Sequence, residues 1–300
     1  MVVVAGGTGL LGTALVDALR TEGHQVSVLS RRPRRVGDVL WSPDGGSQAW
    51  TATLGDADVV VNLAGTSIGS RRWTVTRKTE IRDSRLEPTR QLVRAIAAAR
   101  HPPGVFLSAS AVGVYGSRDG GPHTEASPAG TDFLASVCRE WEAVAAEAAA
   151  TSRVVLLRSG VVLAREGGAL AQLALPFRFY AGGPVGSGAQ YMSWIHLYDW
   201  VAMVRWALTS SDVSGPLNVT SPFPVTNREF AQTLGRVLGR PAVLRAPAFA
   251  VRLALGEMAD ALVLGGQRVM PERASQGGFV FRYPTLEPAL QEALKPHAPA

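Results

Sequence analysis

Eight residues near the start of the chain, AGGTGLLG at positions 5–12, constrain the fold more than any other stretch. They follow the apolar run MVVV and open a segment in which apolar residues recur at helical spacing. Glycines between a strand and a helix allow a tight turn and let backbone N–H groups approach a pyrophosphate at the positive end of the helix dipole. The pattern predicts dinucleotide binding, and the alternative is a purely structural turn. The predicted contact residues are Gly6, Thr8, Gly9, Leu10, Leu11 and Gly12.

Apolar strands without alternation are predicted further along the chain, at residues 25–30, 58–65, 104–110 and 153–163. Helical patterns separate them, at residues 10–23, 87–100 and 133–150. Continuous apolar strands separated by helices indicate a parallel sheet covered on both faces. The fold class is therefore α/β, a Rossmann-type doubly wound parallel sheet.

Glycine and proline become denser after about residue 164, which indicates a smaller C-terminal substrate or cap lobe. We expect a cofactor-binding Rossmann domain over residues 1–164 and the smaller lobe over residues 165–300. Residues 194–220 are expected to return to the Rossmann sheet.

The end of the second predicted strand, LSRRPRR at 29–35, indicates which dinucleotide binds. An acid there would bind the ribose 2′-OH of NAD, whereas arginine accommodates the 2′-phosphate of NADP. Arg31 and Arg32 follow the strand, and the next acid is Asp38. This predicts NADP(H). For Arg34 and Arg35 a solvated loop is the simpler interpretation. Trp41 could contact the adenine or be a buried structural residue.

The overall charge and composition exclude several classes of protein. The net charge of +6 comes from 28 arginines and only two lysines, Lys78 and Lys295, spread without aromatic interleaving, so we expect no nucleic-acid partner. No apolar stretch approaches the roughly 20 residues of a membrane span, so we expect no membrane partner. The single cysteine and the lack of a secretory signal favour the cytoplasm. The five histidines lack ligand spacing, so no metal is expected.

Several motifs in order resemble a known family over nearly the whole chain. They are AGGTGLLG, SRRWTVTRKTEIRDSR (70–85), SASAVGVYG (108–116), FLASVCREWE (133–142), LRSGVVL (157–163), SWIHLYD (193–199) and GPLNVTSPFPVTNREFA (215–231). They are similar to the atypical extended short-chain dehydrogenases/reductases, in the NAD-dependent epimerase/dehydratase-like family of the YfcH / SDR39U1 type. The segment 269–290 resembles the small C-terminal domain of that branch. The resemblance implies a Rossmann domain and NADP(H) binding. It does not identify a substrate.

The resemblance also implies where the cofactor lies. Leu63, Ala64 and Gly65 would line its adenosine side, and Ser159, Gly160 and Val161 its nicotinamide side. Residues 108–110 close a strand of the predicted sheet, and ligands of such sheets bind outside the carboxyl ends of the strands. We therefore expect Ser108 and Ala109 to contact the cofactor and Ser110 to face the substrate.

The catalytic tyrosine and lysine that the resemblance implies are absent. In the superfamily they are spaced YxxxK on one helix, so that the ammonium lowers the pKa of the phenol. Phe133 and Val137 occupy those positions, and no YxxxK exists anywhere in the chain. Ser110 is at the place of the catalytic serine. Tyr115 is the candidate for an alternative acid, and the other interpretation is that it packs or lines the substrate site.

Three further groups have a functional and a structural interpretation. His196 and Asp199 are expected to be a structural hydrogen-bonded pair rather than catalytic. Cys138 shows no neighbouring base that would make it a nucleophile. The four residues Arg72, Trp73, Arg82 and Arg85 could bind an anionic substrate or form a solvated helix face.

Two functions compete on this evidence. The first is an NADP(H)-binding, epimerase-like oxidoreductase with an unusual acid, acting on an unknown small carbonyl or hydroxyl compound. The second is a non-catalytic NADP(H) sensor that binds a protein partner, which the missing tyrosine and lysine favour.

Overall fold

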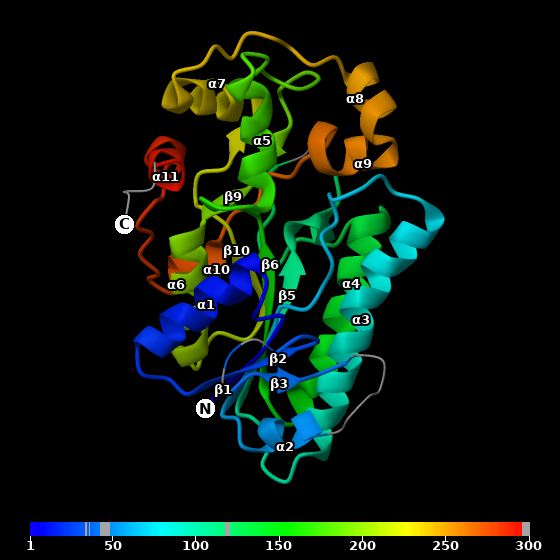
Figure 1. The fold of residues 1–300 in the computed structure, drawn as a ribbon, viewed down its shortest axis with the longest axis vertical. Coiled ribbons are helices and arrows are strands. Elements are labelled where there is room, and N and C mark those ends of the chain that lie inside the picture. Colours follow the sequence, from blue (N-terminus) through cyan, green and yellow to red (C-terminus); the bar gives the residue numbers. More distant parts are fainter. Residues whose placement is uncertain (34, 36, 43–48, 118–120, 296–300) are drawn as a thin grey trace.

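A seven-stranded parallel sheet forms the centre of the computed structural model (Figure 1). The structure describes all 300 residues except 34, 36, 43–48, 118–120 and 296–300. The strand order is β10-β6-β5-β4-β1-β2-β3, and every paired neighbour is parallel. The strands are β1 (Val2–Ala5), β2 (Val26–Ser30), β3 (Val39–Leu40), β4 (Val59–Asn62), β5 (Val105–Ala111), β6 (Arg153–Ser159) and β10 (Gly215–Val219). The Rossmann-type α/β fold is thus confirmed.

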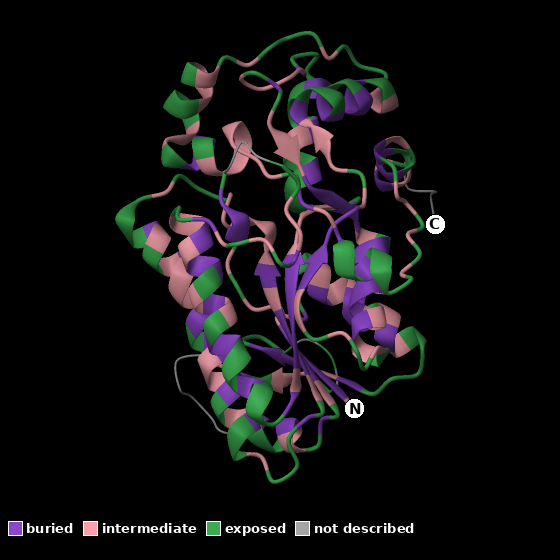
Figure 2. Cartoon of the chain, turned by 180° about the vertical axis from the view of Figure 1, so that it is seen from behind, coloured by how far each residue is buried: buried purple, intermediate pink, exposed green. Residues whose placement is uncertain are grey.

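Helices cover both faces of this sheet, which explains why its strands are apolar without alternation. One face packs on α1 (Leu10–Thr21) and α6 (Leu197–Thr209), and the other on α2 (Ala49–Gly55), α3 (Val75–Ala98) and α4 (Phe133–Ala146). Within β1, Val2 and Val4 belong to the first core, and Val3 and Ala5 to the second. The sheet is almost wholly buried in Figure 2.

A smaller lobe lies beyond the carboxyl ends of the strands (Figure 1). Its own core joins α5 (Gly168–Arg178), α7 (Asn227–Leu238) and α11 (Leu286–Ala293). Two small sheets pair β7 (Val161–Leu163) with β9 (Trp194–His196) and β8 (Tyr191–Met192) with β11 (Val225–Thr226). The helices α8 (Ala248–Leu255), α9 (Glu257–Ala259) and η3 (Asp260–Leu264) follow.

The C-terminal segment does not stay in this lobe. Ala274 of α10 (Glu272–Gln276) packs into the core between the sheet, α1 and α6. The strand β10 pairs with β6 at the edge of the main sheet. Among the described residues, no helix is long and apolar enough to cross a membrane.

Two predicted elements differ from those observed. The predicted strand 153–163 is two strands in different sheets, because the chain turns at Gly160. A Cβ on Gly160 would lie 2.6 Å from the Ser193 carbonyl oxygen, so the backbone just before β9 approaches too closely for a side chain. The helix predicted from residue 87 begins at Val75, and Pro88 lies inside it although proline favours a first helical turn.

Candidate functional site

The three glycines of the loop after β1 play different parts. Gly6 has φ of +77°, and a Cβ there would lie 2.7 Å from the carbonyl carbon of Leu63. A Cβ on Gly12 would lie 2.3 Å from the Gly6 oxygen, so Gly12 is required for packing of α1 against the loop. A Cβ on Gly9 would meet only the Gly6 oxygen, at an ordinary 3.5 Å, and Gly9 has φ of −80°. The protein itself therefore does not require glycine at position 9.

The loop presents the start of α1 to the carboxyl edge of the sheet. Thr8, Gly9 and Leu10 are exposed, Leu11 is half-buried, and α1 begins at Leu10. The first N–H groups of a helix lack intrahelical acceptors and lie at its positive end. A pyrophosphate at the start of α1 could approach the backbone at Gly9, because glycine has no side chain to block it.

The end of β2 carries the two arginines predicted to select the cofactor. Arg31 and Arg32 are exposed, and the backbone N–H of Arg32 donates to Ser30 Oγ at 3.1 Å. No carboxylate of the described residues forms an ion pair with either guanidinium. The nearest candidate acid in sequence is Asp38, whose side chain is 3 % exposed and accepts from the backbone N–H of Arg35 at 3.0 Å. At the end of β2, Arg31 and Arg32 are thus available to bind a phosphate on the ribose of the cofactor, and the Asp38 carboxylate is bonded within its own loop.

The neighbouring predicted residues have structural contacts. Arg35 forms an exposed ion pair with Asp17 at 2.8 Å, and Arg34 lies outside the described residues. Trp41 is buried edge-on against Trp50, with ring centroids 5.9 Å apart, and donates its backbone N–H to Ser30. Its contact with adenine stays a prediction.

The segment after β4 lies against the glycine loop. Leu63 donates its backbone N–H to Ala5, and Ala64 donates to Asn62 Oδ1 at 3.1 Å. A Cβ on Gly65 would lie 3.3 Å from Cγ of Arg85. The structure therefore brings the predicted adenosine-side residues next to Gly6.

Arg85 is a largely buried cation on this side. Its guanidinium donates to the carbonyls of Ile81 (2.8 Å) and Thr66 (3.0 Å), and burial lowers its pKa. None of the described carboxylates pairs with it, whereas Arg82 is paired with Glu140 and Asp83. Of the four residues of the predicted anion-binding group, Arg85 alone is both largely buried and without an acid. Trp73 packs edge-on against Phe133, and Arg72 is exposed beside Gly256.

The end of β5 is tied into a buried polar network. Ser108 accepts from Asn62 Nδ2 at 3.5 Å and is fully buried, with Ala109 half-buried beside it. Ser110, 4 % exposed, donates its hydroxyl to Glu142 Oε1 at 2.6 Å. The Glu142 carboxylate also accepts two bonds from Arg158, at 2.7 and 2.8 Å. The hydroxyl of Ser110 thus donates to α4, and its contact with a substrate stays a prediction.

Tyr115 has no exposed surface. Its hydroxyl donates to Asn218 Oδ1 at 2.7 Å and accepts from Arg158 at 2.9 Å, and its ring stacks on His123. Burial raises the pKa of the phenol, although Arg158 opposes this. These contacts favour the packing interpretation of Tyr115, and its role as an acid stays an untested prediction.

The helix α4 carries apolar side chains where the family resemblance places the catalytic pair. Val137 is buried, and Phe133 is half-buried. The ammonium of Lys78 lies 4.6 Å from the centroid of the Phe133 ring and donates to Glu257 Oε1 at 2.7 Å. Sequence reasoning used Lys78 only to exclude YxxxK. No local sequence signal marks Lys78, because the helix predicted from the sequence begins only at residue 87 and Phe133 of α4 is brought beside Lys78 by the fold.

The predicted nicotinamide side follows β6. Ser159 Oγ accepts from the indole of Trp200 at 3.0 Å, Gly160 donates its N–H to Val219, and Val161 donates to Ser193. These contacts place the segment between the main sheet and the smaller lobe. Contact with a cofactor stays a prediction for all three residues.

The remaining candidates are structural. The Asp199 carboxylate accepts from the backbone N–H groups of Arg282 and Tyr283, at 2.8 Å each. His196 Nδ1 accepts from the backbone of Tyr198, so the two residues of the expected pair brace the chain without bonding to each other. Burial and Glu142 raise the pKa of Cys138 to about 12, so its thiol stays protonated. The described residues contain no cluster of three or more metal-ligating side chains.

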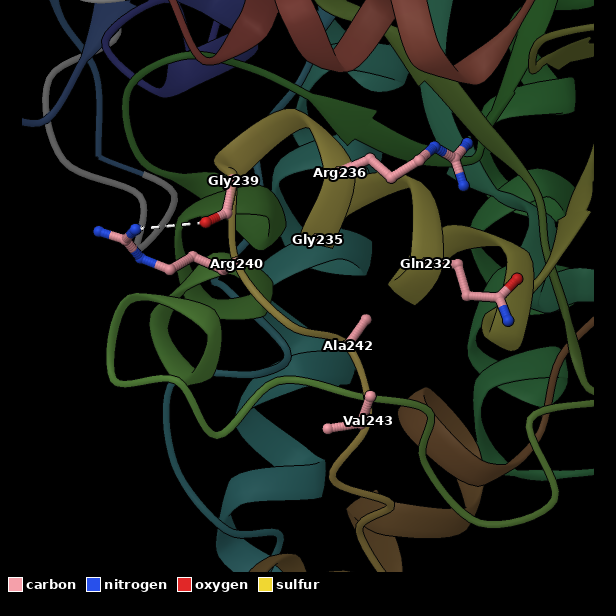
Figure 3. Close-up of a pocket in the computed structure, with 7 residues that line it drawn as sticks. All are labelled: Gln232, Gly235, Arg236, Gly239, Arg240, Ala242 and Val243. Carbon is pink, nitrogen blue, oxygen red and sulfur yellow. Dashed lines mark hydrogen bonds between the residues drawn. The ribbon is translucent and has the colours of Figure 1, made fainter.

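A cavity of about 470 Å³ lies elsewhere, beside α7 (Figure 3). Gln232, Gly235, Arg236, Arg240 and Val243 are among its lining residues. None of them belongs to the glycine loop or to a strand end of the main sheet. We therefore assign this cavity no part in cofactor binding.

Comparisons with known proteins agree with this geometry. The model described as the NAD dependent epimerase/dehydratase family matches residues 2–220, and a domain of unknown function, DUF1731, matches residues 246–293. An epimerase family protein of Mycobacterium leprae is 43 % identical over 297 residues, covering 98 % of this chain and 95 % of that protein. The crystal structure of human epimerase family protein SDR39U1 (isoform 2) with NADPH has a TM-score of 0.89 and 38 % identity, covering 98 % of both chains.

Proposed function

Because the chain belongs to the NAD dependent epimerase/dehydratase family, we propose that it is an NADP(H)-dependent oxidoreductase acting on a small carbonyl or hydroxyl compound. The family resemblance drawn from the sequence motifs is confirmed by relatives of the SDR39U1 type. The proposed site is the carboxyl edge of the main sheet, where the glycine loop, the end of β2 and the segment after β4 meet.

The observation that carries cofactor binding is the open space at Gly9. Gly6 and Gly12 are glycines because the protein backbone leaves no room for a Cβ. Gly9 has neither that restriction nor a positive φ, so a purely structural turn would accept alanine there. A phosphate that approaches the backbone at the start of α1 supplies the missing reason.

The charge at the end of β2 supports NADP(H) over NAD(H). Arg31 and Arg32 have no carboxylate partner in the described chain, and Asp38 is turned away into its own loop. Guanidinium groups bind phosphate with charge-assisted hydrogen bonds. The human relative crystallised with NADPH supports the same assignment.

When bound, the nicotinamide would supply or accept a hydride, and the chain must then hold the substrate oxygen and move a proton. Ser110 and Tyr115 are bonded to Glu142, Asn218 and Arg158, which supports positioning roles for them. The ammonium of Lys78 beside Phe133 is a group that can donate a proton or bind an anionic oxygen there. We include it as the acid of the proposed reaction.

A non-catalytic sensor is the second candidate, and one observation favours it. The superfamily's tyrosine and lysine are replaced by Phe133 and Val137, and the remaining tyrosine of this region, Tyr115, is fully buried. A protein with this arrangement could bind NADPH and report its presence to a partner without turnover.

Calorimetry with Gly9→Ala and Gly12→Ala tests the cofactor site. Gly9→Ala should keep the melting temperature of the parent and lose NADPH binding, whereas Gly12→Ala should lower the melting temperature. Normal NADPH binding by Gly9→Ala would refute the site. Oxidation of NADPH over a panel of aldehydes and ketones then separates the enzyme from the sensor, since a sensor binds NADPH and consumes none.

A further inference from the structure

Several segments at one end of the molecule are rich in arginine. Residues 168–192 and 225–255 contain six arginines and one acid, which gives these two segments a net charge of +5. They form α5, α7, α8 and the connection 239–247, which lie at the end opposite the N-terminus (Figure 1).

Four of these arginines have no acid partner. Arg236 pairs with Glu287 and Arg252 with Asp260. No carboxylate of the described chain pairs with the other four, Arg178, Arg228, Arg240 and Arg245. The acid within these segments, Glu229, is used in the capping box of α7 with Thr226.

Two of the unpaired guanidiniums converge on one carbonyl. Arg228 and Arg245 both donate an N–H to the Ser187 oxygen, at 3.1 and 2.7 Å. Both side chains are exposed. Two like charges this close repel each other unless an anion lies between or beside them, so the pair is a ready site for a phosphate group.

Protruding apolar side chains surround these arginines. Phe179 is 74 % exposed and Val243 77 %, and Arg240 lies over the exposed ring of Tyr180. On α8, Phe249 and Leu253 are 73 % and 77 % exposed and, four residues apart, share one face. No residue of α8 is buried, as Figure 2 also shows.

Backbone contacts join these residues into one surface, which we call the arginine end. The Leu244 N–H donates to Gly182, and Val185 pairs with Ala246. A Cβ on Gly186 would lie 3.9 Å from Ala248 Cβ at the start of α8. The loop after α5, the connection 239–247 and α8 are therefore contiguous.

We propose that the arginine end docks on an anionic lipid bilayer. Protruding Phe and Leu interleaved with arginine are the pattern of a protein that lies on a membrane, with headgroup phosphates on the guanidiniums and the apolar tips in the acyl boundary. A protein interface has an apolar core depleted of charge, whereas here Arg240 lies over the ring of Tyr180, and Phe179 and Leu253 directly follow Arg178 and Arg252 in the chain. The expectation of no membrane partner rested on the lack of a span, which a surface contact does not need.

Vesicle co-sedimentation tests this on the full chain. Vesicles of phosphatidylcholine and phosphatidylglycerol, roughly 3 to 1, should bind the protein at about 0.1 M salt and release it at about 1 M salt. Pure phosphatidylcholine should bind it far less. Arg228→Gln with Arg245→Gln should weaken partition by about thirtyfold, since each basic residue near the surface contributes about fivefold.

Matched variants separate this contact from general charge. Arg94→Gln with Arg100→Gln removes the same charge from exposed residues at the far end of α3 and should leave binding unchanged. Phe249→Ser with Leu253→Ser leaves the net charge unchanged. This variant should bind anionic vesicles more weakly and keep the melting temperature of the parent. The proposal is wrong if anionic vesicles do not bind, or if both arginine pairs have equal effects. Binding to poly-glutamate without binding to vesicles would instead identify an acidic polypeptide as the partner.

Discussion

The hydroxyl of Ser110 donates to Glu142 across the interface between β5 and α4, and Arg158 of β6 holds the same carboxylate with two hydrogen bonds. Both charged side chains are almost fully buried. The serine at the family's catalytic position is thus oriented by an ion pair. This pair joins β5 and β6 to α4, the helix that lacks the catalytic tyrosine and lysine.

Glu142→Ala should destabilise the protein by about 3 kcal/mol, because it leaves Arg158 buried without its partner. Glu140→Ala on the same helix is the matched control: its partner Arg82 is well exposed, so the cost should be below about 1 kcal/mol. Urea unfolding at neutral pH measures both. Equal free energies of unfolding for the two variants would contradict the burial argument.

Arg31→Ala with Arg32→Ala should weaken NADPH binding at least tenfold, because each charge-assisted bond to the 2′-phosphate contributes about 1.5 to 3 kcal/mol. NADH binding should hardly change, since NADH lacks that phosphate. Calorimetry with both nucleotides measures the preference. Equal affinity of the unmodified protein for NADH and NADPH would remove the NADP(H) assignment.

The sequence predicted those features that depend on local chemistry. The three glycines, the unalternated strands and the arginines after β2 are each recognisable within a few residues. The early start of α3 was missed because Pro88 resembles a first-turn proline, and the turn at Gly160 because the approach of Ser193 comes from a segment more than thirty residues away.

The same limit applies to the catalytic candidates. Ser110 lies near the end of β5 and Tyr115 four residues after the strand ends, but their hydroxyl partners Glu142 and Asn218 come from distant elements. Lys78, which we propose as the acid, could not be recognised from the sequence because its neighbours Phe133 and Glu257 are brought to it only by the fold.

His196 should make the protein less stable as the pH falls from about 6.5 to about 4. Burial lowers its pKa from 6.5 to about 4 in the folded protein, so the unfolded chain takes up a proton first in this range. Its contribution is complete above pH 6.5, and the loss approaches about 3 kcal/mol near pH 4. His196→Asn keeps an acceptor at the start of α6 and removes this titration. The free energy of unfolding is measured against pH for the unmodified protein and for His196→Asn. The difference between the two curves isolates the titration of His196 from those of Glu125 and Asp199, whose pKa values are raised by burial. A constant difference over this range would contradict the assignment.

Lys78→Met should abolish turnover and leave NADPH binding intact, because the ammonium lies over Phe133 and not at the glycine loop. A lost general acid lowers the rate by about a hundredfold or more. The loss of the exposed pair with Glu257 should change the free energy of unfolding by less than about 1 kcal/mol, so a fall in activity cannot be a folding effect.

Lys78→Arg distinguishes two roles: arginine restores a charge that binds an anion but does not release a proton near neutral pH. Recovery in Lys78→Arg therefore indicates binding, and no recovery indicates proton donation. Because the chain has only two lysines, ¹³C-dimethylation gives separate lysine signals for Lys78 and Lys295, and the Lys78 signal should shift when a substrate binds to the NADP(H)-loaded protein. Full turnover by Lys78→Met would show that the proton comes from another group.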